Sequence, residues 1–370
     1  MGLPPTFPPK SGALILLGAL TVSFVAVAEE AAPASAPAAA TSAPAAPSVG
    51  APSAGAAAAQ ATAKVEQSKW YEQFAGSTIS YGHNVAATTL SRSAQPYYNP
   101  TYGHRLGLMP EWHPNEQLFV RGRWFLSQEL TLSDSTRWAH EVELSDVLID
   151  VGTSGWKEAR TGIRIGGDVR LSLPTSKVSL AQTRVLAVGP SVSVSKNFNV
   201  LAGLSFAYSA RFTYRFNRFT TPQLEGPTIG ACGDARSPEC AEFVTTGTRN
   251  THFDLTHALS ASFSPHEKVT LSSALLLSSY WLYPLAAAPA GVQGSNQLDP
   301  TTSTNLRNTT MFNLSVTYQP IKPLGLTLGA FTAAPMLGDD GQRLFPLFNR
   351  NTSLYLEAAI DVEAAAASLL

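Results

Sequence analysis

From about residue 70 to residue 362 the chain alternates between apolar and polar residues with a period of two. Between residues 198 and 217 the even positions carry mainly apolar and aromatic side chains, and most odd positions carry Gly, Ser, Thr or Arg. This period is that of a β-strand whose two faces meet different surroundings. Several of the alternating runs exceed the five or six residues typical of globular strands. The pattern therefore predicts an all-β protein with unusually long strands.

The predicted strands are joined by connections that alternate between short and long. Twelve strands are expected at 76–86, 104–113, 117–131, 143–152, 160–174, 183–195, 198–217, 251–264, 267–284, 307–320, 323–337 and 351–362. Tight turns are expected at 113–116, 153–156, 196–197, 265–268 and 321–323, and long loops include 87–103, 218–250 and 285–306. Outer-membrane barrels share this arrangement, with short periplasmic turns and long outer loops. The sequence thus predicts a transmembrane antiparallel up-and-down β-barrel whose two ends are periplasmic.

Aromatic residues gather near both ends of the predicted strands, as the two interfacial girdles of a membrane barrel would require. The residues near the turns are Trp70, Tyr71, Phe74, Trp112 and Trp156. The residues near the loops are Trp124, Phe212, Tyr214, Phe216, Tyr280, Trp281 and Tyr283.

The segments before and after the barrel have other compositions. Residues 1–28 combine Lys10, an apolar run over 11–24 and a small-residue Ala26-Val27-Ala28 site, which predicts a cleaved signal peptide. Residues 29–66 are rich in Ala, Pro and Ser and predict a disordered periplasmic linker. The barrel is expected over residues 67–363, followed by a C-terminal tail over 364–370. Localisation in a bacterial outer membrane follows from the export signal and the barrel together.

Composition excludes other classes of protein. Charged residues make up only 14% of the chain, and 25 Lys and Arg against 26 Asp and Glu give a net charge of -1. A nucleic-acid partner is not expected, because no basic excess is present. After the N-terminal segment no apolar run is long enough for a helical membrane span. The expected partners are outer-membrane lipids, small-molecule solutes and, during biogenesis, the barrel-assembly machinery.

If the apolar face of each strand contacts lipid, the polar face lines an enclosed aqueous lumen. The predicted lumen residues are Arg121, Arg123, Glu129, Asp146, Asp150, Arg164, Asp168, Arg170, Arg211 and Arg215. In one interpretation these residues orient small polar or anionic solutes that diffuse through the barrel. In the other they form ion pairs that fill a closed structural or adhesive barrel. A lipid-modifying barrel enzyme is a third hypothesis.

Two neighbouring strands carry a resemblance to a known family. Residues 143–151, with Ser145-Asp146, and residues 162–176, with Leu173-Pro174-Thr175, resemble bacterial outer-membrane barrels of the transporter-like family associated with the phenol-degradation pathway. The resemblance implies a membrane barrel and a channel for small organic molecules. It transfers no binding residue.

The remaining motifs predict one disulfide bond and no catalytic site. Cys232 and Cys240 lie in one predicted outer loop, and an exported chain meets an oxidising compartment, so a disulfide bond is expected. The tripeptides Tyr81-Gly82-His83 and Tyr102-Gly103-His104 bring two histidines near each other without an evident third ligand, so no metal site is predicted. The serines and histidines show no recognisable nucleophile motif, so neither an enzyme nor a cofactor is expected.

Overall fold

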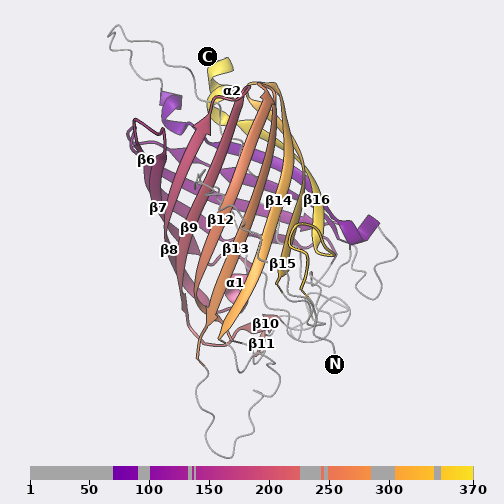
Figure 1. The fold of residues 1–370 in the computed structure, drawn as a ribbon. Helices are drawn as coiled ribbons and strands as arrows, with labels where there is room; N and C mark the ends of the chain where they lie inside the picture. The colour runs from indigo at the N-terminus through magenta and orange to yellow at the C-terminus, as the bar shows by residue number, and fades with distance from the viewer. Residues whose placement is uncertain are drawn as a thin grey trace, which may run out of the picture.

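A computed structural model describes residues 70–90, 101–131, 136, 139–225, 243–245, 249–284, 305–336 and 343–369. Over these residues the chain forms a closed antiparallel β-barrel of 12 strands, with a separate two-stranded sheet at one end (Figure 1). The fold class predicted from the alternation is therefore confirmed. The predicted signal peptide, the linker up to residue 66 and both cysteines lie outside the described residues.

The wall of the barrel follows the order of the chain. It contains β1 (Thr78–Ala86), β2 (Tyr102–Met109), β3 (Glu111–Trp112), β4 (Leu118–Glu129), β5 (Val142–Leu144), β6 (Val147–Lys157), β7 (Arg164–Leu173), β8 (Arg184–Phe198), β9 (Gly203–Asn217), β12 (Thr251–His266), β13 (Val269–Leu282), β14 (Leu306–Ile321), β15 (Leu324–Pro335) and β16 (Thr352–Asp361). The pair β2 and β3, and the pair β5 and β6, each form one interrupted strand of the barrel. Strand β16 pairs with β1 and closes the wall.

Short elements lie at the two ends of the barrel. They are η1 (Trp70–Phe74), η2 (Ala87–Leu90), α1 (Lys177–Ala181), α2 (Val362–Leu369), β10 (Gln223–Glu225) and β11 (Phe243–Thr245). Helix α2, where the sequence predicted only a tail, contacts η1 at the end opposite β10 and β11 (Figure 1). Among the described residues, no helix is long and apolar enough to cross a bilayer.

The alternation along each strand separates an apolar outer surface from a polar interior. On β12, Leu259 points outward and is 51% exposed, whereas its neighbour Ser260 points inward and is buried. Outward Val169 and Leu328 on other strands are also exposed. The register is continuous over most of each ladder, so one choice of face extends around the barrel.

Two predicted turns are wrong, because the chain stays in the sheet at both places. Residues 153–156 belong to β6, where the register shifts between Thr153 and Trp156. Gly155 occupies the bulge with φ of 87°, a left-handed conformation that glycine adopts without a Cβ penalty. Likewise Lys196 and Asn197 lie inside β8, and the connection to β9 is formed by residues 199–202. Gly155 thus marks an irregular position within a strand, and Asn197 lies in a regular stretch of the β8–β9 ladder.

The interior is not polar throughout. On the inward faces of β12 to β16 a cluster of buried side chains forms the apolar side of the lumen: Ala258, Ala274, Leu276, Met311, Phe331, Ala333 and Tyr355. The phenol of Tyr355 donates a hydrogen bond of 3.0 Å to Asn313. Its ring lies across Gly329 on the neighbouring strand, where a Cβ would overlap it. Side chains therefore fill this half of the barrel.

The close contact between Gly329 and Tyr355 predicts a local stability effect. We expect Gly329→Ala to lower the free energy of unfolding by about 1–3 kcal/mol, because the methyl group must displace the ring. Gly325→Ala is the matched control, since a Cβ there meets only ordinary contacts. Urea titration of both variants in lipid vesicles measures the difference. Equal stability of the two variants would contradict the predicted contact.

Candidate functional site: an arginine and carboxylate cluster in the lumen

The most deeply buried charge of the lumen belongs to Asp150 on β6, whose side chain is 1% exposed. Three arginines surround its carboxylate. Arg123 on β4 donates to Oδ2, Arg170 on β7 donates through Nε to Oδ1 at 2.7 Å, and Arg211 Nη1 lies 3.8 Å from Oδ1. The arrangement follows from the register, because Asp150 lies directly opposite Arg170 on the adjacent strand. One carboxylate thus ties together three strands that carry arginine.

Asp168 on β7 extends this cluster toward β9. Arg211 donates through Nη2 to Asp168 Oδ2 at 2.7 Å. Ser191, on the strand between them, also donates to Asp168. The central group thus contains three guanidinium groups and two carboxylates: Arg123, Arg170, Arg211, Asp150 and Asp168. It carries a local excess of one positive charge when all five groups are ionised.

Further pairs lie above and below this group along the same wall. Arg215 donates to Asp254 at 2.8 Å, and its guanidinium lies 5.5 Å from the centre of the Tyr280 ring. Toward the turn end, Arg121 donates to Glu111 at 2.5 Å. Ion pairs therefore follow the interior from the turn end toward the loop end.

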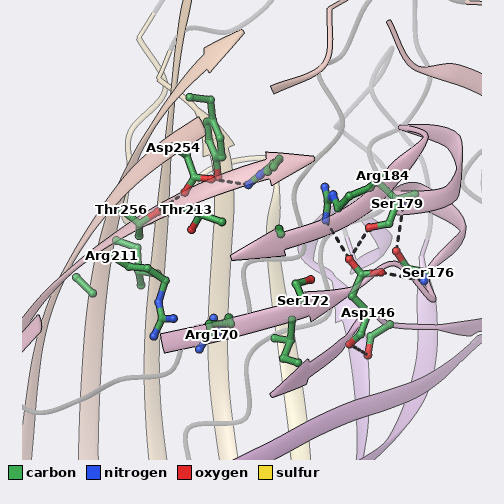
Figure 2. A pocket seen from close by; sticks show the side chains of 18 of the residues that line it. Asp146, Arg170, Ser172, Ser176, Ser179, Arg184, Arg211, Thr213, Asp254 and Thr256 are labelled. Atoms are coloured by element: carbon green, nitrogen blue, oxygen red, sulfur yellow. Dashed lines mark hydrogen bonds and ion pairs between the residues drawn. The ribbon is translucent and has the colours of Figure 1, made fainter. Parts of the chain in front are cut away.

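At the loop end the segment containing α1 folds against the wall through Asp146. This residue lies in the gap between β5 and β6, where it accepts hydrogen bonds from the backbone N–H of Ser176 at 2.9 Å and from the hydroxyl of Ser179. Arg184 also donates to its Oδ2 at 3.0 Å. Figure 2 shows Asp146 facing these three partners. The Asp146 carboxylate therefore helps to hold the α1 segment in the mouth of the barrel, together with the ion pair of 3.3 Å between Lys177 and Glu141.

A cavity of about 110 Å³ lies between α1 and the opposite wall. Arg170, Arg184, Arg211 and Arg215 line it together with Asp146 and Asp254 (Figure 2). Apolar groups of Ala258, Leu276 and Tyr280 complete the lining. The space has room for several water molecules. It therefore combines an arginine-rich side with an apolar side.

Most of the predicted lumen residues meet in these pairs, and two lie apart from them. The members of the ion pairs are Arg121, Arg123, Asp146, Asp150, Asp168, Arg170, Arg211 and Arg215. Glu129 lies at the loop end of β4, where it accepts a hydrogen bond of 2.7 Å from Thr131. Arg164 is exposed at the turn end of β7.

Arg105 and Arg184 lie in the interior but were absent from the predicted set. Arg105 on β2 donates to Glu357 on β16 at 3.3 Å, across Gly82 on the strand between them. The alternation of its strand would have found Arg105, because Leu106 and Leu108 share the opposite face. Arg184 gave no such signal: a register shift between Arg184 and Leu186 interrupts the period of two.

The two tripeptide histidines lie on the outer face rather than in the lumen. His83 and His104 are directly opposite each other on β1 and β2. Tyr102 and Tyr81 each hydrogen-bond one of them at 3.0 Å, pairing Tyr102 with His83 and Tyr81 with His104. Within the described residues, no three His, Cys, Asp or Glu side chains gather as a metal site requires. The four rings form an outward aromatic patch near the loop end.

No protein-family model matches the chain, and no curated protein matches it. Solved structures do. An outer membrane channel from Pseudomonas putida F1 is 12% identical, with 80% of this chain and 99% of that chain covered and a TM-score of 0.48. The NanC porin is 9% identical, with 77% and 98% covered and a TM-score of 0.38. The channel DcaP of Acinetobacter baumannii is 11% identical, with 77% and 95% covered and a TM-score of 0.29.

Proposed function

We propose that this protein is a bacterial outer-membrane channel that lets small polar or anionic solutes diffuse across without energy input. The chain is exported by its signal peptide, and its barrel ends and Ala/Pro-rich linker face the periplasm. Lipids surround the wall and small solutes are its partners. The proposed role of the lumen is to let solutes pass and not to catalyse a reaction.

The outer surface supports a membrane location. Exposed outward residues such as Val169, Leu259 and Leu328 form a wall that would be unfavourable in water as one continuous surface. All twelve strands are paired on both sides, which leaves no edge to satisfy in a bilayer. The same apolar surface can contact the hydrocarbon of a bilayer without a desolvation cost.

The observation that carries the proposal is the ladder of ionised groups on the inward faces of β4, β6, β7 and β9. Buried charges are unfavourable in an apolar core unless they are paired. Here they are paired with a small excess of arginine, around a cavity. Such a lining attracts anions and orients dipolar solutes. The apolar side formed by Ala258, Leu276 and Tyr280 would suit a small organic anion with a nonpolar part.

A closed barrel is the competing function, and one observation favours it. Ion pairs fill one half of the interior, and the apolar cluster around Phe331 and Tyr355 fills the other. If the pairs do not rearrange, nothing larger than water passes. A lipid-modifying role has less support, because the serines and histidines of the sequence show no recognisable nucleophile motif.

Conductance across a planar bilayer tests the proposal. We expect the refolded protein to give discrete steps with a preference for anions. Arg211→Ala should reduce this preference by roughly fivefold, since a unit charge at contact distance in water is worth about 1 kcal/mol. Arg160→Ala, in the exposed turn after β6, should leave it unchanged. The absence of conductance under all conditions would favour the closed barrel. If both variants changed the anion preference equally, the paired arginines and carboxylates would not determine selectivity.

A further inference from the structure

The connection between β15 and β16 folds back over the outside of the barrel wall. Its described part, residues 343–351, is called the β15–β16 flap here. Thr332 and Thr352 lie beneath the flap, and their strand positions place them on the outward face, since their neighbours Phe331 and Ser353 point inward. Yet the two threonines are only 1% and 0% exposed. The flap therefore covers a patch of wall that would otherwise face lipid.

Hydrogen bonds fix the backbone of the flap to that patch. Thr332 donates through Oγ1 to the carbonyl of Leu347 at 3.0 Å, and the N–H of Asn349 donates to Thr352 Oγ1 at 2.8 Å. The side-chain amide of Asn349 also donates to the carbonyl of Phe345 at 2.8 Å. These contacts satisfy polar groups that would be unfavourable in hydrocarbon. The flap is an ordered element of the wall.

The opposite side of the flap is apolar and points away from the protein. Phe345 is 62% exposed, Phe348 is 58% exposed and Leu347 is also exposed. Large aromatic residues at this exposure are unfavourable in water and favourable at a membrane interface. Arg343, which is exposed, and Arg350 bracket the apolar segment. An apolar segment between two arginines matches a lipid whose phosphates lie above its acyl chains.

We propose that the β15–β16 flap binds an anionic lipid of the outer leaflet. Phe345, Leu347 and Phe348 enter the upper acyl region, and Arg343 and Arg350 contact the phosphates. The flap lies at the loop end of the strands, opposite the short turns, which places it at the outer leaflet. This inference rests on the membrane orientation within the proposed function and not on solute passage.

The depth of the flap is tested with Phe348→Trp in vesicles that contain a phosphorylated lipid A glycolipid. The emission of the new tryptophan is obtained by subtracting that of the parent protein, which has 6 tryptophans. We expect blue-shifted emission that acyl-brominated lipids quench and acrylamide does not. Arg160→Trp, in a turn at the other end, should instead be quenched by acrylamide. Acrylamide quenching at position 348 would overturn the proposal, as would insensitivity to both quenchers, which indicates cover by a second copy or another protein.

The charge of the flap is tested by native mass spectrometry after extraction from the same vesicles. Wild-type protein should retain the phosphorylated glycolipid. Arg343→Ala combined with Arg350→Ala should lower the retained fraction by at least about fivefold, given the attraction of each basic residue to anionic headgroups. Arg160→Ala should retain as much as wild type. Unchanged retention in the double variant would overturn the phosphate contact. If the protein gave no conductance but both lipid tests gave the expected results, the channel function would be rejected and the lipid site would still be supported.

Discussion

Replacing Asp150 with asparagine should lower the free energy of unfolding of the barrel by about 3–5 kcal/mol. The carboxylate is buried and contacts Arg123, Arg170 and Arg211, so its neutralisation leaves three positive groups together with only Asp168 to offset them. An unpaired buried charge is more unfavourable than a buried apolar group of the same size. Guanidinium titration of the protein folded in vesicles, followed by tryptophan fluorescence, measures the change.

Two further variants make the Asp150 result specific. Glu116→Gln removes a carboxylate from the exposed turn before β4 and should change stability by less than about 0.5 kcal/mol. Arg123→Met added to Asp150→Asn removes one of the uncompensated cations and should restore part of the loss, as coupled neighbours do. If Asp150→Asn were as stable as Glu116→Gln, the cluster would not hold the wall together.

Replacing Leu259 with arginine should reduce stability in a bilayer by about 2–4 kcal/mol. Leu259 points outward from the middle of β12 and is among the more exposed leucines of the wall. A charge at this depth must be dehydrated or must draw water and headgroups into the membrane. The free energy of unfolding of the variant in vesicles provides the measurement.

The cost of a charged side chain on this surface should depend on its depth in the bilayer if the surface contacts lipid. Leu306→Arg places the same charge outward at the loop end of β14 and should change stability by only about 0–1 kcal/mol. A protein with this face in water would tolerate both substitutions equally. Similar stabilities for the two variants would therefore contradict contact between this face and the hydrocarbon of a membrane.

The alternation of residues was sufficient to predict the barrel because each strand has one face toward the interior and one away from it. It placed Asp150, Arg170 and Arg211 inside, and the register then brought them into contact. Arg184 could not be predicted this way, since its contact with Asp146 depends on a register shift that reverses the parity. A pattern of period two does not reveal where one extra residue is inserted into a strand.

Other errors came from signals that have two meanings. Gly155 marks a bulge rather than a turn. Tyr280 was predicted in the loop-side girdle but points inward and lines the cavity, because its strand position shares the face of Leu276. The folding of residues 343–351 onto Thr332 and Thr352 depends on contacts between a loop and a finished wall. No local pattern encodes such contacts.

The seam between β1 and β16 joins the two ends of the barrel sequence, with Thr78 opposite Asp361. Until β16 docks, the facing edges of β1 and β15 remain unpaired templates that can associate with other chains. A shortened polypeptide lacking β16 would therefore keep two adhesive edges, whereas a complete one has none.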